Sequence, residues 1–140
     1  MFRVLTIVLA LASPAAAEEF TIFSYAEGDH FVQFGRDGSL GDLIVWSGEI
    51  QDEAGVRLGS DFGRCTRLDA AGNYLCNSIV NMEGRGRLVL NGVQLPEPAP
   101  STFVIVAGTG DFAGATGSLI STPVENRARF RYEVSVDLSQ

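Results

Sequence analysis

The chain has 140 residues, which is enough for one domain with a single hydrophobic core and too few for two ordinary domains. Its formal net charge of −7 at pH 7 argues against nucleic acid and anionic membranes as partners, because both require compensating positive charge. After the N-terminal region, no stretch is apolar and charge-free over the roughly 20 residues of a spanning helix, so we expect no membrane span.

The first 17 residues have the composition of a secretory signal peptide. Arg3 gives a short basic start, Val4–Ala12 form an apolar run, and Ala15–Ala17 provide a small-residue cleavage site. We therefore interpret residues 1–17 as a signal peptide and residues 18–140 as the mature domain. This interpretation predicts a periplasmic or secreted protein.

Turn signals recur about every ten residues after Phe20, which is typical of an all-β sandwich or barrel. The runs between these turns are rich in Val, Ile, Phe and Thr. We predict no helix and place a turn at Asn91–Gly92. We predict eight strands, near residues 20–34, 42–51, 59–68, 73–82, 86–91, 101–107, 115–121 and 127–138.

Two of these runs indicate which faces are buried. The last run alternates, with Phe130, Tyr132 and Val134 on an apolar face and arginines and acids on the other, so one face is buried and one is wet. The run Thr102–Ala107 is apolar on both faces, which predicts that its outer face is covered by a second subunit or by the chain itself. We therefore expect a homo-oligomer.

Cys65 and Cys76 are the only cysteines in the chain. The residues between them read as two short strands around the turn Asp69–Gly72, and pairing Leu68 with Asn73 places the two cysteines opposite each other. Exported proteins meet an oxidising environment, so we predict a Cys65–Cys76 disulfide. Two cysteines and a single distant histidine do not form a four-ligand zinc set, so we expect no metal site.

The segment Val106–Leu119 contains G-x-G-x-x-A after a predicted strand, which is nominally the pattern of a dinucleotide-binding turn. That turn requires a following helix whose N-terminus holds the pyrophosphate, and the glycines and Pro123 make a poor helix. We therefore expect no nicotinamide or flavin cofactor. We assign a tight connection between strands, with positive φ and close backbone approach, to Gly108, Gly110, Gly114 and Gly117.

The candidates for lining a cavity are aromatic: Trp46, Tyr74, Phe103, Phe130 and Tyr132. Ordinary core packing is the favoured explanation of the same residues. The stiff segment Pro96–Pro100 is expected in a loop near a barrel rim, where it is either a lid or a plain connection. Arginines near the central hairpins either steer an anionic lipid or phenolate toward a barrel mouth or pair with local acids: Arg64, Arg67, Arg85 and Arg87.

Three segments together resemble dirigent proteins and the bacterial proteins with an allene oxide cyclase-like barrel. The glycine-rich segment resembles the motif V-x-G-G-T-G-x-F/Y-x-x-A-x-G, and the two other segments resemble the family's central strands, turns and cysteines. The segments are "GDLIVWSGEIQDEAGVRLGSDFGRC" (Gly41–Cys65), "NYLCNSIVNMEGRGRLVLNG" (Asn73–Gly92) and "VIVAGTGDFAGATGSL" (Val104–Leu119).

The resemblance implies a single eight-stranded antiparallel β-barrel with an apolar interior, assembled as a dimer or trimer. Activities in this family are isomerase-like or cyclase-like, and the barrel mainly fixes the conformation of its substrate. Plant dirigent proteins commonly have Arg where this chain has Thr116, so whatever role that arginine has in the family does not carry over to this position. Their acidic residues near the second strand have no certain match in Glu49 or Asp52, and the catalytic residues remain unknown.

We therefore expect a barrel that binds a small hydrophobic molecule of the lipid, phenolic or polyketide class and steers its cyclisation or coupling, without a cofactor. The alternatives are a non-catalytic carrier of such a molecule and a structural barrel without a ligand. A cavity of a few hundred Å³ that includes Trp46 or Tyr132 and a buried carboxylate or arginine would favour the enzyme.

Overall fold

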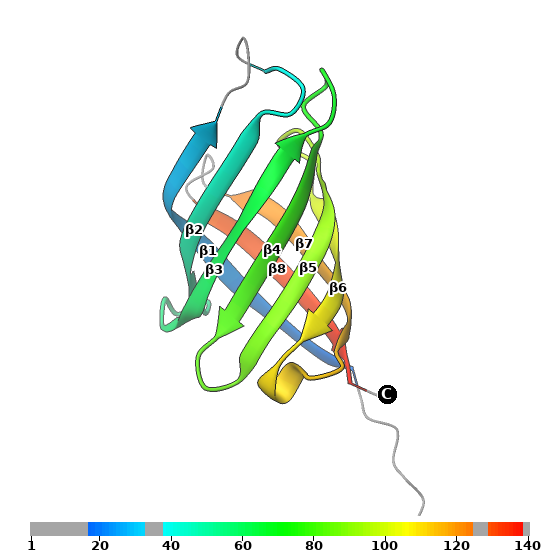
Figure 1. The fold of residues 1–140 in the computed structure, drawn as a ribbon. Coiled ribbons are helices and arrows are strands. Elements are labelled where there is room, and N and C mark those ends of the chain that lie inside the picture. Colours follow the sequence, from blue (N-terminus) through cyan, green and yellow to red (C-terminus); the bar gives the residue numbers. More distant parts are fainter. Residues whose placement is uncertain (1–16, 33–37, 125–128, 139–140) are drawn as a thin grey trace, which may run out of the picture.

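The computed structural model describes residues 17–32, 38–124 and 129–138, which form a closed antiparallel barrel (Figure 1). The strands follow chain order around the barrel, and β1 pairs with β8 to close it. They are β1 (Glu18–Val32), β2 (Leu43–Gln51), β3 (Arg57–Arg67), β4 (Tyr74–Met82), β5 (Gly86–Gln94), β6 (Ser101–Gly108), β7 (Thr116–Val124) and β8 (Arg129–Asp137). Within the described ranges no helix is long and apolar enough to cross a membrane.

The predicted all-β, eight-stranded barrel is confirmed, and each predicted run overlaps one strand. Among the described residues no α-helix interrupts the strands, and a three-residue 3-10 turn, η1 (Gly110–Phe112), lies between β6 and β7. The proposed signal peptide lies outside the described residues apart from Ala17.

The predicted turn at Asn91–Gly92 is wrong, because both residues lie inside β5. Asn91 sits on the outer wall, where its side chain accepts a 2.6 Å hydrogen bond from Asn77 of β4. Gly92 pairs with Phe103 of β6, and a Cβ at Gly92 would lie 2.8 Å from the Phe103 ring. Glycine is therefore required here for close packing rather than for a change of chain direction.

Side chains along β8 alternate between the interior of the barrel and its outer wall. Tyr132, Val134 and Val136 are buried in the interior, whereas Glu133 and Asp137 are exposed on the outer wall. At the end of the barrel that holds η1, the interior is filled by apolar side chains that include Phe112 and Leu88, both fully buried. This packed end forms the floor below the rest of the interior.

The glycine-rich segment makes the connection from β6 through η1 to β7, so no helix of a βαβ unit follows its glycines. Gly108 ends β6, Gly114 follows η1, and Gly117 lies in β7. Gly110 has a φ of +63°, and a Cβ there would collide with the carbonyl oxygen of Arg85. The backbone of this segment thus packs directly against the β4–β5 turn.

The disulfide predicted between Cys65 and Cys76 is present and joins β3 to β4. The two cysteines are directly paired across the strands, as Thr66 and Leu75 are beside them. The turn closes with a 2.8 Å hydrogen bond from the Leu68 amide to the carbonyl of Asn73.

Candidate functional site

A cavity of about 400 Å³ occupies the end of the barrel opposite η1. Its mouth lies between the β3–β4 turn, which contributes Gly72, and the β5–β6 loop, which contributes Leu95, Pro96 and Glu97. The base of that loop is fixed by a 2.9 Å hydrogen bond from the Leu95 amide to the Ser101 hydroxyl. Part of the proline-rich segment therefore forms the rim of the cavity.

All five aromatic residues named from the sequence line this cavity. The alternation that buries Val134 also turns Tyr132 and Phe130 inward. The inward faces of β2, β4 and β6 provide Trp46, Tyr74 and Phe103. The remaining wall includes the hydroxyl groups of Ser24, Ser78 and Ser121 together with aliphatic carbon. The arrangement suits a planar apolar molecule with few polar groups. Contact of the five aromatic residues with a ligand stays a prediction.

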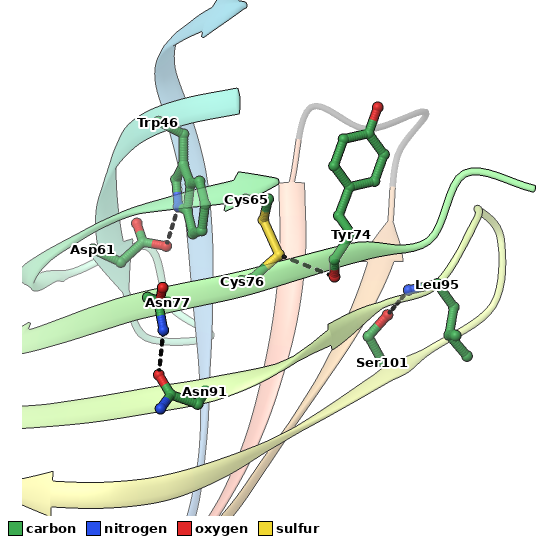
Figure 2. Close-up of a disulfide and its surroundings, with 9 residues drawn as sticks. All are labelled: Trp46, Asp61, Cys65, Tyr74, Cys76, Asn77, Asn91, Leu95 and Ser101. Carbon is green, nitrogen blue, oxygen red and sulfur yellow. Dashed lines mark hydrogen bonds between the residues drawn. A yellow bond between two sulfur atoms is a disulfide. The ribbon is translucent and has the colours of Figure 1, made fainter. Parts of the chain in front are cut away.

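Asp61 of β3 lies at the side of the cavity that faces the packed end and has no exposed surface. Three side chains that line the cavity donate hydrogen bonds to its carboxylate. The Ser24 hydroxyl lies 3.0 Å from each carboxylate oxygen, the Tyr132 hydroxyl lies 2.8 Å from Oδ2, and the Trp46 indole N–H lies 3.4 Å from Oδ2. Figure 2 shows the Trp46 indole directed toward Asp61 beside the disulfide. The carboxylate therefore reaches the cavity only through these partners.

Burial raises the pKa of both side chains in the Asp61–Tyr132 pair. Desolvation raises the pKa of Asp61 above its ordinary value, although the hydrogen bonds from Tyr132, Ser24 and Trp46 act in the opposite direction. Desolvation and the neighbouring Asp61 charge raise the pKa of Tyr132 well above its usual range. Tyr132 thus stays a hydrogen-bond donor, and Asp61 is a carboxyl group able to exchange a proton nearer to neutral pH.

Glycine at position 63 makes room for this cluster. A Cβ at Gly63 would lie 2.6 Å from the six-membered ring of Trp46, so only glycine lets the indole lie against β3. Gly63 pairs with Trp46 across β2 and β3, two residues from Asp61 and two from Cys65. The sequence S-D-F-G-R-C therefore places a carboxylate, a gap for the indole and a disulfide on one face of one strand.

The four arginines considered from the sequence do not line the cavity. Arg67 at the rim donates 2.9 Å and 3.1 Å hydrogen bonds to the carbonyls of Asp69 and Ala70 and a 3.3 Å hydrogen bond to the Tyr74 hydroxyl. Arg85 lies at the packed end, 2.8 Å from Glu18. Pairing with local groups thus explains Arg67 and Arg85. Arg64 and Arg87 are exposed, and Arg87 donates a 3.2 Å hydrogen bond to the Asn81 side chain.

Asp61 is the residue of this cluster that the sequence analysis missed. The acids weighed there lie elsewhere, because Glu49 is 3.3 Å from Arg57 and Asp52 accepts a hydrogen bond from the amide of Val56 in the β2–β3 turn. The available signal was the spacing of Asp61 four residues before Cys65, which puts both on the same face of a strand. Among the described residues, no group of three or more His, Cys, Asp or Glu side chains is placed to hold a metal ion.

No protein-family model matches the chain, and no curated protein matches its sequence. Solved structures do match its fold. A pyocyanin demethylase superposes with a TM-score of 0.76 at 22% identity, over 85% of this chain and 99% of the other. A pterocarpan synthase dirigent protein gives 0.72 at 12% identity, over 94% and 95% of the two chains.

A third similar structure is an exo-specific intermolecular Diels–Alderase, with a TM-score of 0.69 at 13% identity over 87% of this chain and 98% of the other. At such identities the likeness concerns the fold. The chain has the dirigent-like eight-stranded barrel fold that its sequence motifs predicted.

Proposed function

We propose that this barrel binds a small apolar molecule in its cavity and steers the cyclisation or isomerisation of that molecule. The observation that carries the proposal is the cavity of about 400 Å³ placed against a buried carboxylate. A barrel that served only as a scaffold would fill this space with side chains, and a simple carrier has no need of a buried Asp61 with its donors. The solved structures named as a Diels–Alderase and as a pterocarpan synthase support the same class of reaction.

The chemical step that fits this geometry is a proton relay through Tyr132. The Tyr132 oxygen takes a proton from an acidic C–H or O–H of the bound molecule while its own proton passes to the Asp61 carboxylate, 2.8 Å away. The electron pair left on the molecule forms the new bond or double bond, and reversal of the relay returns the proton to a different atom. The product is an isomer of the substrate, so the step needs no oxidant or reductant.

The aromatic wall contributes orientation. Trp46, Tyr74, Phe103 and Phe130 offer ring faces on several sides of the cavity, which restrict a flexible or planar ligand to few poses. Such a wall accepts phenolic and polyketide ring systems and the unsaturated part of a lipid, which are the classes that the family resemblance implies. The ligand belongs to one of these classes.

Trp46 is the only tryptophan in the chain and lines the cavity, so its fluorescence reports binding directly. We would titrate the protein with a panel of phenolics, polyketide fragments and unsaturated fatty acids, with calorimetry in parallel, and analyse each mixture for isomerised product. We expect binding of at least one class and product formation that Tyr132→Phe abolishes while binding persists. The matched control is Tyr25→Phe on the outer wall. Absence of any binding would overturn the proposal, and binding without any product would identify a carrier.

We also propose that the protein acts as an exported homo-oligomer, a dimer or trimer. Val104, Val106 and Ile120 form an apolar patch on the outer wall of β6 and β7, where Val104 is 53% exposed. An apolar patch of this kind is typical of a subunit interface. The disulfide and the signal-like N-terminus support export.

Light scattering of the mature protein tests the assembly. We expect a mass of two or three chains, and a single chain for Val104→Arg, because the variant buries an unpaired charge in the interface. Ser47→Arg, on the outer wall of β2, is the matched control and should stay assembled. A wild-type protein that is monomeric at high micromolar concentration would contradict the proposal.

A further inference from the structure

Two serine hydroxyl groups of the cavity wall have no hydrogen-bond partner among the residues that the structure describes. They belong to Ser78 of β4 and Ser121 of β7, which both line the cavity. Each residue is more than nine-tenths buried, since Ser78 is 8% exposed and Ser121 is 9% exposed. Ser24, the third serine of the wall, differs from them because its hydroxyl already donates to Asp61.

Each of these two serines lies beside an aromatic residue of the cavity. Ser78 pairs with Gly63 of β3, and the six-membered ring of Trp46 lies against that glycine, 2.6 Å from the position of an added Cβ. Ser121 pairs with Tyr132 across β7 and β8. A planar ligand that packs against these rings therefore brings its edges close to both hydroxyl groups.

The two serines lie on different parts of the cavity wall. β5 and β6 separate β4 from β7 in the barrel, and their inward side chains include Leu90 and Phe103. A ring system that fills the cavity thus meets a hydroxyl group at two separate edges and apolar side chains between them.

A ligand in the cavity changes the surroundings of these hydroxyl groups. A hydroxyl that faces an open cavity is hydrated, and a ligand that displaces this water either replaces its hydrogen bonds or leaves a buried polar group unpaired. A serine hydroxyl both donates and accepts, so a phenolic hydroxyl or a ketone oxygen satisfies it, whereas a hydrocarbon does not. A site with such groups rejects the analogue that lacks the matching polar atom.

We propose that Ser78 and Ser121 are specificity-determining residues that hydrogen-bond two oxygen atoms at separate edges of the ligand. The ligand is then an oxygenated ring system, of the phenolic or polyketide class, rather than the hydrocarbon part of a lipid. The inference rests on the proposed function in that the cavity is the binding site, and it narrows the three ligand classes named above to two. It concerns affinity rather than turnover.

The test uses three bicyclic compounds of nearly equal shape: naphthalene, 2-naphthol and naphthalene-2,6-diol. Their dissociation constants are measured by calorimetry at about pH 7, where phenolic hydroxyl groups are uncharged because their pKa is about 10. In a cavity without polar partners naphthalene would bind best, because it leaves water most readily. We expect the opposite order, with the diol at least about tenfold tighter than naphthalene and 2-naphthol between them.

The variants Ser78→Ala and Ser121→Ala should each weaken binding of the diol by about fivefold and leave naphthalene binding unchanged or stronger. The double variant should lose the preference for the diol. Ser47→Ala is the matched control, because it removes the same hydroxyl from the outer wall of β2, and all three dissociation constants should stay unchanged. Urea denaturation checks that the cavity variants fold, and we expect no loss of stability because each removes a hydroxyl without a partner in the described structure.

The outcomes separate this inference from the binding function. If naphthalene binds as tightly as both hydroxylated compounds, or if a cavity variant weakens all three compounds equally, the serine assignment is wrong while the binding function stands. If a ligand of the earlier panel binds but none of the three bicyclic compounds does, the two variants are titrated with that ligand, and an unchanged dissociation constant overturns the assignment. If no compound of either set binds, the binding function itself fails.

Discussion

Tyr132 of β8 donates a 2.8 Å hydrogen bond to Asp61 of β3, joining residues 71 positions apart in the sequence. The two strands are not neighbours in the barrel, so this bond crosses the interior. Ser24 of β1 and Trp46 of β2 donate to the same carboxylate from the two strands between them. Through these hydrogen bonds, the Asp61 carboxylate links four consecutive strands of the closed barrel, β8, β1, β2 and β3, beside the cavity.

Removal of the Tyr132 hydroxyl should destabilise the barrel. Tyr132→Phe keeps the ring but leaves a buried carboxylate with one donor fewer, and we expect the free energy of unfolding to fall by about 1–3 kcal/mol. Urea denaturation followed by Trp46 fluorescence measures this change. Tyr25→Phe on the outer wall should change the unfolding free energy by less than about 0.5 kcal/mol. Equal effects of the two substitutions would mean that the Asp61 bond contributes nothing specific.

The pH dependence of stability should identify Asp61. Its pKa is raised in the folded barrel, so its contribution to stability is fully present below the pKa of the unfolded chain and is lost as the pH rises through the folded pKa. Asn at this position does not ionise. We therefore expect the unfolding free energy of Asp61→Asn minus that of the wild type to increase from about pH 4 toward neutral pH and then to level off.

Denaturation curves of both proteins across this range provide the measurement. Glu18, whose pKa is lowered by Arg85, and the other carboxyl groups are present in both proteins, so their effects cancel in the difference. A difference that is constant with pH would show that the folded and unfolded pKa values of Asp61 coincide.

The fold was accessible from the sequence because it depends on repeated local patterns. The alternation around Tyr132 and Val134 and the regular turn spacing each favour the same barrel, and the pairing of Cys65 with Cys76 follows from a short turn. Gly92 was assigned wrongly because a glycine that makes room for Phe103 looks the same in sequence as a glycine that turns the chain.

The carboxylate cluster was not accessible in the same way. The partners of Asp61 come from β1, β2 and β8, and their meeting depends on how the closed barrel brings non-neighbouring strands across its interior. Strand alternation states only that Asp61 shares a face with Cys65. The size of the cavity is likewise a property of the closed barrel, since the same five aromatic residues could have filled it.

The disulfide should contribute to stability and shape the cavity wall. Cys65 lines the cavity, and the bridge closes a loop with a sequence separation of 11 residues. We expect the double variant Cys65→Ser/Cys76→Ser to lose about 2–4 kcal/mol of unfolding free energy, as is typical for bridges of this size. Thiol titration of the native exported protein should find no free cysteine. Two reactive thiols there would show that the bridge does not form in the cell.

Filling the cavity should separate ligand binding from folding. Ser78 of β4 lines the cavity and is paired with Gly63, the residue against which the Trp46 ring lies. In Ser78→Phe the new ring would occupy the space that a ligand needs while burying apolar surface, so we expect unchanged or higher stability and at least about tenfold weaker binding. Ser47→Phe on the outer wall adds the same ring outside the barrel and should leave binding intact. Calorimetric titration with whichever ligand the wild type binds, alongside urea denaturation of each variant, measures both properties. Full-strength binding by a folded Ser78→Phe protein would place the ligand elsewhere than in this cavity.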